Sequence, residues 1–264
     1  MKISAYIIAF NEVDKIRDCI NSVLWADEII VVDSYSTDGT TEIAEELGTK
    51  VIQIPFNGFG NLRNQAINHC NGDWIISLDC DERCTYEVRD EILSLVENTP
   101  LDIYHVPRKN YFMGKWIKHS GWYPDYRGVP QLFRNGKMSY TMESVHEGLV
   151  SHSDKEIGSI KNFIWQFPFK NTEEVMHKAN RYSTLGLAKL QDKGKTGGFF
   201  IAFLHGLWSF IKHYIFKLGF LDGGAGLVIA FGNFEGTFYR YIKLTEAQSD
   251  WSMPSVKPIH KVNK

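Results

Sequence analysis

The chain has 264 residues, of which 44% are hydrophobic and 23% are charged, and its formal net charge is −2. This length suits one large domain, or one domain with an appendage. A charge so close to neutral excludes the strong basic field that attracts nucleic acid, so we expect no nucleic-acid partner. The four cysteines match no common zinc-binding spacing, and we expect free thiols in a reducing cytoplasm.

The first hundred residues alternate between strand and helix patterns. The strand-like runs are continuous and apolar, and they lie at 2–10, 27–33, 50–56 and 73–79. The helix patterns that follow each of them lie at 12–25, 36–48, 58–70 and 85–98. Continuous apolar strands that alternate with helices predict an α/β fold, in which a mostly parallel sheet carries helices on both faces.

The pattern changes after this alternating segment. Residues 101–165 contain shorter strand-like runs, which are rich in aromatic and β-branched residues and are divided by Gly and Pro. Residues 166–246 are dominated by helical patterns, and residues 247–264 show neither pattern. We therefore expect one α/β domain over 1–165, with halves that meet near residue 100, followed by a helical appendage and a tail.

The stretch IISLDCDE at 75–82 ends an apolar strand in several acidic residues. Asp79 and Asp81 are two positions apart, so their side chains point to the same side of an extended chain. Asp33 also ends a predicted strand. Because ligands of parallel sheets bind beyond the carboxyl ends of the strands, we expect these three carboxylates to border one crevice.

Two carboxylates as close as Asp79 and Asp81 repel each other, and a bound cation relieves that repulsion. Hard divalent ions such as Mg²⁺ and Mn²⁺ bind carboxylate oxygens and keep phosphate oxygens as further ligands. The pair therefore predicts a divalent metal that bridges the protein to a diphosphate. The alternative interpretation is a solvated acidic turn, because the D-x-D pattern is common.

Several motifs together resemble inverting glycosyltransferase family 2. They are AFNE at 9–12, EIIVVDSYSTDGT at 28–40, GFGNLRNQA at 58–66 and GDWIISLDCDE at 72–82, and then HSGWYPDYRGVPQLFR at 119–134, SVHEG at 144–148 and GFLDGGAG at 219–226. The chain is similar to the branch that builds the lipopolysaccharide inner core, of the heptose β-1,4-glucosyltransferase type. The resemblance implies a GT-A nucleotide-sugar-binding fold and the inverting transfer of a hexose, with glucose expected, from a UDP-sugar donor.

The resemblance also implies roles for the residues that match the family's motifs. The expected nucleotide-sugar-binding residues are Phe10, Asn11, Glu12, Asp33, Arg63, Asn64 and Asp79. Among these, Phe10 and Asn11 border the base, Asp33 holds its polar edge, and Arg63 and Asn64 reach toward the uridine or the diphosphate. An Arg beside a diphosphate forms planar, charge-assisted hydrogen bonds.

By the same analogy, His146 joins Asp79 and Asp81 as the third metal ligand. The acceptor hydroxyl needs a general base that stands apart from the metal. Asp125, in what we interpret as a turn rich in Gly, Pro and aromatic residues, is the first candidate for that base, and Glu147 is the competing one.

The surroundings of Asp125 suggest an acceptor site. Trp122 and Tyr123 precede it and could stack on a sugar face, although a large aromatic residue is more often part of a core. Lys118 belongs to a local basic rim that could meet acceptor phosphates, and ordinary solvated charge is the alternative.

The stretch 197–220 is the most apolar of the chain. His205, Lys212, His213 and Lys217 interrupt it, which argues against a clean transmembrane span. We expect it to lie on a membrane surface, as part of a peripheral protein on the cytoplasmic face of the inner membrane, where it would meet a lipid-linked glycan acceptor. The alternative is packing against the catalytic domain or against a second copy in a homo-oligomer. We interpret GFLDGGAG as a turn between helices.

Other functions fit parts of the sequence. A polyprenyl-phosphate sugar transferase shares the expected fold, but its acceptor is a phosphate, which needs no base. A non-catalytic, membrane-associated carbohydrate-binding protein would bind sugars without releasing UDP. A sugar-nucleotide pyrophosphorylase needs a Gly-rich phosphate loop after the first strand, and AFNEVDK at 9–15 does not provide one.

Overall fold

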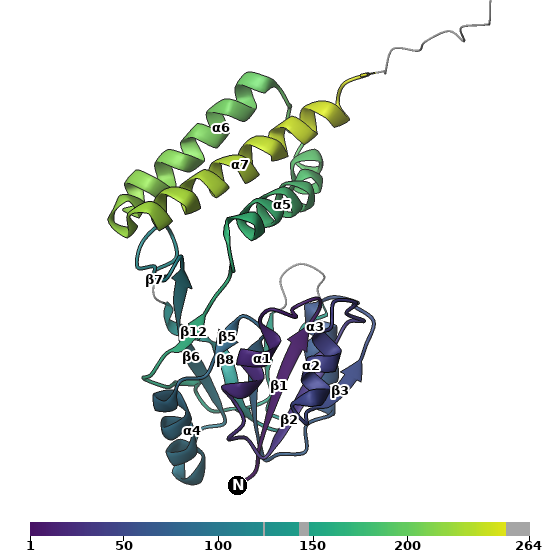
Figure 1. Ribbon diagram of the computed structural model, residues 1–264, viewed down its shortest axis with the longest axis vertical. Helices are drawn as coiled ribbons and strands as arrows, with labels where there is room; N and C mark the ends of the chain where they lie inside the picture. The colour runs from purple at the N-terminus through teal and green to yellow at the C-terminus, as the bar shows by residue number, and fades with distance from the viewer. Residues whose placement is uncertain (124, 143–147, 252–264) are drawn as a thin grey trace, which may run out of the picture. The chain divides into compact units, whose positions relative to one another are not determined.

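The computed structural model describes residues 1–123, 125–142 and 148–251, without the side chains of 125–127. The chain divides into two compact units, labelled by their elements in Figure 1. Unit 1 comprises Met1–Lys118 and Trp122–Pro168, and unit 2 comprises His119–Gly121 and Phe169–Lys264. The sequence analysis placed this boundary near residue 165 and did not anticipate that three residues from the middle of the chain belong with the helices.

Unit 1 contains a mixed sheet of ten strands with the order β3-β2-β1-β4-β8-β6-β12-β5, to which β7 and β11 are added alongside β6. The parallel half consists of β1 (Ile3–Ala9), β2 (Glu28–Asp33), β3 (Lys50–Gln53) and β4 (Trp74–Asp79). The other half consists of β5 (Glu82–Arg83), β6 (Ile103–Phe112), β7 (Lys115–Trp116), β8 (Asp125–Arg134), β11 (Gly158–Ser159) and β12 (Ile164–Gln166). Strands β9 (Met138–Tyr140) and β10 (Leu149–Ser151) form a separate antiparallel pair.

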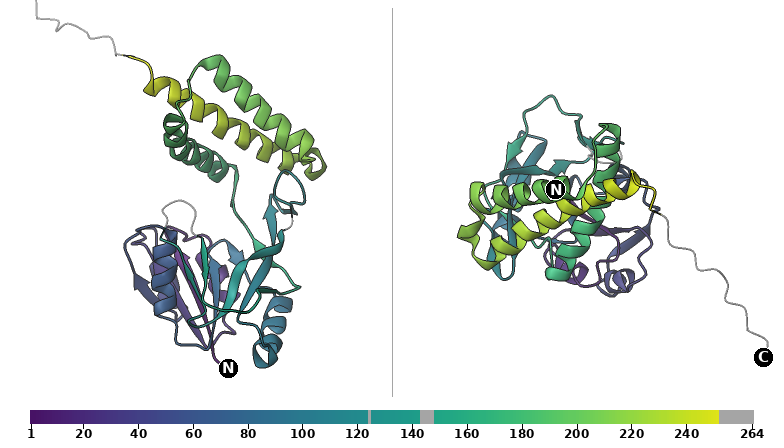
Figure 2. Two further views of the ribbon diagram at one scale, coloured as in Figure 1. Left: turned by 180° about the vertical axis from the view of Figure 1, so that it is seen from behind. Right: turned by 90° about the horizontal axis from the view of Figure 1, so that it is seen from above.

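Helices cover both faces of this sheet, as the ribbon from two sides shows (Figure 2). They are α1 (Ile16–Asn21), α2 (Thr40–Glu46), α3 (Phe59–Asn68) and α4 (Tyr86–Asn98). The side chains of β1 alternate between two apolar clusters: Ile7 lies in the cluster that includes residues of α1, α2 and α4, and Ile8 lies in the one that includes residues of α3. The expected α/β class is confirmed, and β1, which is buried on both faces, is mostly apolar, with Ser4 donating a hydrogen bond to Glu28.

The described part of unit 2 is built from three long helices. They are α5 (Thr172–Asp192), α6 (Phe199–Ile211) and α7 (Gly224–Ala247), with a π-helical turn η1 (Lys212–Phe216) and a 3₁₀ turn η2 (Gly219–Asp222) between the last two. Helix α7 packs against both α5 and α6. Gly206 allows the close approach of α6 and α7, because a Cβ atom there would lie 3.0 Å from the ring of Phe234.

The helical run Phe199–Phe216 is largely exposed. It has 18 residues with a mean hydropathy of 1.3, and 11% of it is buried within the described part of the chain. By length and composition alone it could cross a membrane, despite the Lys and His residues that the sequence analysis weighed against a span. In unit 1, all four cysteines are buried and free, as expected from their spacing.

Candidate active site

The carboxyl ends of three parallel strands meet at one edge of the sheet. The register pairs Ala9 of β1 with Asp33 of β2, and Ile8 of β1 with Asp79 of β4. Asp33 and Asp79 therefore stand on either side of the end of β1, and Asp81 follows two residues after β4. This is the edge at which parallel sheets bind their ligands.

Asp33 is fully buried and is bound by the loop that follows its own strand. Its carboxylate accepts hydrogen bonds from the backbone N–H of Ser36, at 2.8 Å, and from the Ser36 hydroxyl. The same hydroxyl oxygen accepts a hydrogen bond of 2.8 Å from the N–H of Asn11. Asp33 thus shapes the loop beside Asn11, and its expected contact with a nucleotide base stays a prediction.

Phe10 and Asn11 of the AFNE segment cross this edge in an exposed position. Phe10 is 56% exposed, and Asn11 has a left-handed backbone with a φ of 54°. The side-chain oxygen of Asn11 accepts a hydrogen bond of 2.9 Å from the N–H of Thr37. Glu12 forms an ion pair of 3.1 Å with Lys15. An exposed ring beside a well-held loop offers a surface on which a flat base can stack.

Arg63 of α3 reaches the end of β4. Its Nη2 lies 2.7 Å from Asp79 Oδ1, and its Nη1 donates to the hydroxyl oxygen of Ser77 at 3.1 Å. The guanidinium also lies over the ring of Tyr140, 5.5 Å from its centroid. Burial by itself would lower the pKa of Arg63, but the attraction of Asp79, together with Tyr6 and Tyr140, outweighs it and holds the pKa above its ordinary value. A permanent positive charge therefore stands beside Asp79.

Asn64, the next residue of α3, binds the backbone of β9. Its Oδ1 accepts from the N–H of Tyr140 and its Nδ2 donates to the Tyr140 carbonyl, both at 2.9 Å. The sequence analysis expected Asn64 to reach toward the nucleotide. In the structure the side chain anchors β9, and its contact with a nucleotide stays a prediction. The expected ligand His146, which follows β9 in sequence, lies outside the described part of the chain.

Asp81 offers carboxylate oxygens at the same edge. Both lie near the Gln166 side-chain amide, 3.4 and 3.3 Å from its nitrogen, and the Asp81 carbonyl accepts a hydrogen bond of 2.7 Å from Phe167. Within the described residues, no three His, Cys, Asp or Glu side chains are grouped as metal ligands. The donor chemistry nevertheless fits a hard divalent cation, because Asp79 and Asp81 supply oxygens and such ions commonly keep phosphate or water as further ligands.

Sequence reasoning missed Glu82, which lies beneath the acidic turn. This residue is fully buried, and its Oε2 accepts from the Asp79 N–H at 3.0 Å and from Gln131 Nε2 at 2.7 Å. Its Oε1 lies 3.0 Å from Arg108 Nη1. These bonds tie the turn to β6 and β8, so that Glu82 sets the position of Asp79 and Asp81. The only sequence signal was a third acidic residue directly after the pair.

The backbone of the candidate base lies on a neighbouring strand. Asp125 is the first residue of β8, and its Cα pairs with that of Arg108 in β6. The expected turn at Asp125 is wrong, because the chain is already extended and paired there. Since Arg108 binds Glu82, this pairing connects the start of β8 to the acidic turn. The competing base Glu147 lies outside the described residues, as His146 does.

The expected acceptor residues surround the β6–β7 hairpin. Trp122 is half-buried, with its ring centroid 6.1 Å from that of Phe112, whereas Tyr123 is 49% exposed. The ammonium of Lys118 lies 4.4 Å from the centroid of the Trp116 ring. Trp122 thus packs partly in the interior, and Tyr123 is the ring that remains open to a ligand.

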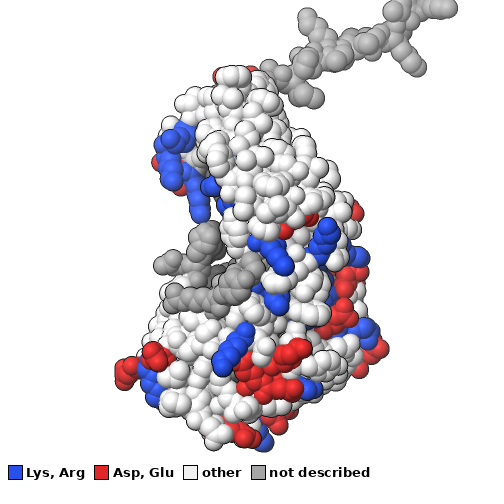
Figure 3. Space-filling model, turned by 90° about the vertical axis from the view of Figure 1, so that its left-hand side faces the viewer, with Lys and Arg blue, Asp and Glu red and all other residues white. Residues whose placement is uncertain are grey.

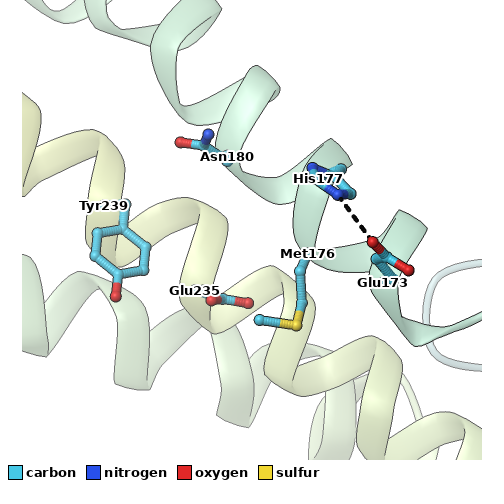
Figure 4. Close-up of a pocket in the computed structure, with 6 residues that line it drawn as sticks. All are labelled: Glu173, Met176, His177, Asn180, Glu235 and Tyr239. Atoms are coloured by element: carbon cyan, nitrogen blue, oxygen red, sulfur yellow. Dashed lines mark ion pairs between the residues drawn. The ribbon is translucent and has the colours of Figure 1, made fainter.

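A pocket in unit 2 contains none of the expected site residues. It lies between α5 and α7, has a volume of about 360 Å³, and is lined by Glu173, Met176, His177, Asn180, Glu235 and Tyr239 (Figure 4). Its ion pair between His177 and Glu173, at 3.5 Å, is largely exposed. It is an open groove, and nothing in it resembles the acidic edge of unit 1.

The sheet of unit 1, in which β2 and β4 end in aspartates and β4 pairs with the antiparallel strand β8, is typical of the GT-A class of glycosyltransferase. The structure of S. aureus TarS 1–349 in complex with UDP shares this fold, with a TM-score of 0.51 and 15% identity over 94% of this chain and 91% of that one. The glycosyl transferase family 2 model matches residues 4–147, which is more than half of the chain. The chain therefore belongs to glycosyltransferase family 2.

Relatives along most of the chain are also glycosyltransferases. A glycosyltransferase of Rickettsia felis is 31% identical over 255 residues, covering 93% of this chain and 90% of that protein. The lipopolysaccharide core biosynthesis glycosyltransferase LpsC of Rhizobium meliloti is 28% identical over 256 residues, covering 88% and 90%. The similarity extends beyond the family domain into the helices of unit 2.

The buried carboxyl of Glu82 predicts a particular pH dependence of stability. Burial and the nearby charge of Asp79 raise its pKa from 4.5 to about 7, against the opposing effect of Arg108. Below pH 4.5, Glu82 is protonated in both the folded and the unfolded protein, so it does not affect stability. Above about pH 7 it is ionised in both, and the folded protein carries the full free-energy cost of the buried charge. Relative to Glu82→Gln, whose side chain does not titrate, the free energy of unfolding of the wild type should fall by about 3 kcal/mol or less across this pH range.

The measurement is the thermal unfolding of both proteins in EDTA, from pH 4.5 to 8. The amide of Glu82→Gln places N–H groups against other donors, so the variant should be less stable than the wild type at low pH. This difference in stability should shrink as the pH rises, because the wild type loses stability and the variant does not. Glu97→Gln, an exposed change in α4, should track the wild type at every pH. A deficit for Glu82→Gln that is independent of pH would show that Glu82 does not titrate in this range.

Proposed function

We propose that the protein is a metal-dependent inverting glycosyltransferase that moves a hexose, with glucose as the first candidate, from a UDP-sugar to a hydroxyl group of a lipid-linked core glycan. The observation that carries this proposal is the meeting of Asp79, Asp81 and Arg63 at the carboxyl ends of the parallel strands. Two carboxylates and one guanidinium are suited to hold a cation and a diphosphate together.

The residues of this edge have distinct tasks with the donor. Asp81, with the oxygen of Asp79 that is turned away from Arg63, would hold Mg²⁺ or Mn²⁺. When bound, the ion supplies Lewis-acid stabilisation of the charge that develops on the leaving diphosphate. Arg63, whose side chain is largely buried, donates hydrogen bonds to the diphosphate, and the exposed ring of Phe10 stacks against the base. His146 is the expected third ligand.

Asp125 is proposed as the general base. The acceptor oxygen attacks the anomeric carbon from the face opposite the diphosphate, so a bond to the acceptor forms as the bond to UDP breaks, and the configuration inverts. The hydroxyl proton passes to the Asp125 carboxylate, and the electron pair of the broken bond leaves on UDP. The start of β8 suits this task, because its pairing with Arg108 connects it to the acidic turn.

Two comparisons support the choice of donor and acceptor. TarS, which shares the fold, has been crystallised with UDP and with UDP-GlcNAc, the latter complex giving a TM-score of 0.50 with 18% identity over 69% of this chain and 66% of that one. LpsC is by name an enzyme of lipopolysaccharide core biosynthesis. A UDP-sugar donor and a sugar of the lipopolysaccharide inner core are therefore the first pair to test.

Asp81→Asn should abolish transfer without unfolding the protein, because a neutral amide is a poor ligand for a hard cation. We expect UDP release from UDP-glucose to fall by about 10²-fold or more, as when a stabiliser of transition-state charge is removed. UDP binding measured by calorimetry should lose its dependence on Mn²⁺. Asp90→Asn, an exposed change in α4, is the matched control. Full turnover of Asp81→Asn, or of the wild type in a chelator, would refute the metal's role.

Asp125→Asn should lower kcat by about 10²–10⁴-fold with the Michaelis constant for the UDP-sugar unchanged, because the amide cannot accept the hydroxyl proton. Transfer to a core-glycan acceptor and to a polyprenyl phosphate should be compared in the same preparation. A variant that keeps wild-type kcat with the glycan contradicts the assignment of the base. Turnover only with the phosphate acceptor would instead identify a polyprenyl-phosphate sugar transferase.

We further propose that unit 2 docks on the cytoplasmic face of the inner membrane, where nucleotide sugars and a lipid-linked acceptor meet. One face of unit 2 is almost free of charged residues (top of Figure 3). The exposed apolar side chains of the α6 run include Phe199, Phe200, Phe203, Leu204, Trp208 and Phe216. No Asp or Glu occurs between Asp192 and Asp222, whereas four Lys residues do, so the charge suits anionic lipid.

Docking on the surface suits unit 2 better than crossing the membrane. Helix α6 packs along α7, which carries Glu235 and Arg240 within its length. A crossing of α6 would draw these charged groups into hydrocarbon, at a high cost in free energy. A surface position buries the aromatic side chains of α6 and leaves Lys212 and Lys217 at the level of the headgroups.

The double change Phe200→Ser and Trp208→Ser should weaken binding to vesicles of phosphatidylethanolamine and phosphatidylglycerol by about tenfold or more, because each buried aromatic contributes about 1.5–3 kcal/mol. Flotation measures this. Tyr86→Ser removes an aromatic that is 77% exposed in unit 1 and should bind as the wild type does. A wild type that stays off the vesicles and elutes as a dimer from a sizing column would assign the apolar face to a second copy.

A further inference from the structure

Three residues between β7 and β8 belong to unit 2 rather than to unit 1. They are His119, Ser120 and Gly121, and the chain returns to unit 1 at Trp122. The sequence analysis noted this HSG segment and the later GFLDGGAG motif as separate features. In the structure the two motifs are bonded to each other within unit 2, about one hundred residues apart in sequence.

The side chain of Asp222 receives three hydrogen bonds from the segment. Its Oδ2 accepts from the backbone N–H of His119 at 3.1 Å and from the Ser120 hydroxyl at 2.8 Å. Its Oδ1 lies 3.1 Å from Nδ1 of the His119 ring, which donates when that nitrogen carries the proton. Charge-assisted hydrogen bonds of this kind are about twice as strong as neutral ones.

The segment has a backbone that does not form readily without such support. Ser120 is completely buried and has a φ of 61°, and Gly121 has a φ of 83°. A left-handed serine costs about 1 kcal/mol or more, so the surrounding bonds must hold it in place. The Ser120 N–H donates to the Lys217 carbonyl at 2.9 Å, and a Cβ atom on Gly121 would lie 2.5 Å from Lys217 Nζ.

The GFLDGGAG motif holds Asp222 in its turn. Leu218 and Gly223, on either side of η2, both have a positive φ, at 54° and 65°. A Cβ atom on Gly226 would lie 1.9 Å from the carbonyl oxygen of Gly219, so only glycine fits there. Asp222 is itself 7% exposed. A tight, glycine-dependent turn thus presents one buried carboxylate to the HSG segment.

We propose that Asp222 is a positioning residue of the transferase, which holds His119–Gly121 and thereby limits where the following segment can place Asp125. This inference rests on the proposed function. Asp125 lies four residues after Gly121, so the connection spans about 14 Å at most. Loss of the anchor would leave the start of β8 to its pairing with β6, in which Asp125 lies opposite Arg108. An error of about 1 Å in the position of a reacting group can cost about 10²-fold in rate.

Asp222→Asn and Asp222→Ala test the inference in the full-length protein, with Asp192→Asn as the control. Asp192 is an exposed acidic residue at the end of α5, so its change removes the same charge from the same unit. Hydrogen exchange should become faster at the amides of His119 and Ser120 in both Asp222 variants, while the strands β1 to β4 keep their protection. The control should exchange as the wild type does.

The kinetic expectation separates positioning from general stability. We expect kcat to fall by about tenfold or more in Asp222→Ala and by less in Asp222→Asn, which keeps one acceptor oxygen. The affinity for UDP with Mn²⁺ should change by about twofold at most, because the donor residues lie on other elements. Ser120→Ala, which removes one of the three bonds, should have the smallest effect, and it remains informative if Asp222→Ala does not fold.

Two results would overturn the inference. One is wild-type kcat in a variant whose HSG amides exchange faster, which would mean that the anchor does not affect the base. The other is a loss of kcat accompanied by an equal loss of UDP affinity, which would indicate general damage. Failure of the proposed function looks different, since the wild type itself would then transfer no sugar with any donor.

Discussion

The turn after β4 carries three carboxylates within four residues, and the fold of unit 1 has to compensate this charge. Arg63 from α3 pairs with Asp79, and Arg108 from β6 pairs with Glu82. Asp81 meets the Gln166 side-chain amide, at 3.3 Å. The acidic turn is therefore held by contacts from α3, β6 and β12, and its carboxylate oxygens are donors of the kind that a hard divalent cation prefers.

This compensation joins the antiparallel half of the sheet to the parallel half. Glu82 reaches the acidic turn from beneath, and its bonds to Arg108 and Gln131 come from β6 and β8. A buried ion pair is retained only where its geometry is good and its remaining hydrogen bonds are satisfied. Strand β8 begins at Asp125, which pairs with Arg108 of β6. The contacts that hold the acidic turn therefore also hold the backbone of the candidate base.

The parts of the structure that depend on local pattern were predictable. Continuous apolar runs gave the strands of the parallel half, and the topology rule for such sheets placed Asp33 and Asp79 at one edge, where the register puts them. The burial of Glu82 was not predictable, because its partners lie 26 and 49 residues away in sequence. The bonds of Asn64 to the Tyr140 backbone were not predictable either, because the two residues lie 76 positions apart, and the expected contact of Asn64 with the nucleotide stays a prediction.

The anchor at Asp222 shows the same limit on a longer scale, and it suggests why the helices are part of the enzyme. The sequence GFLDGGAG predicts a turn between helices. Only the structure shows that this turn presents the Asp222 carboxylate to His119, which lies 103 residues earlier. If unit 2 served only to bind lipid, a flexible linker to the catalytic unit would be sufficient. A buried, charge-assisted anchor four residues before the candidate base would instead make the geometry of the proposed reaction depend on the unit that we propose to meet the membrane.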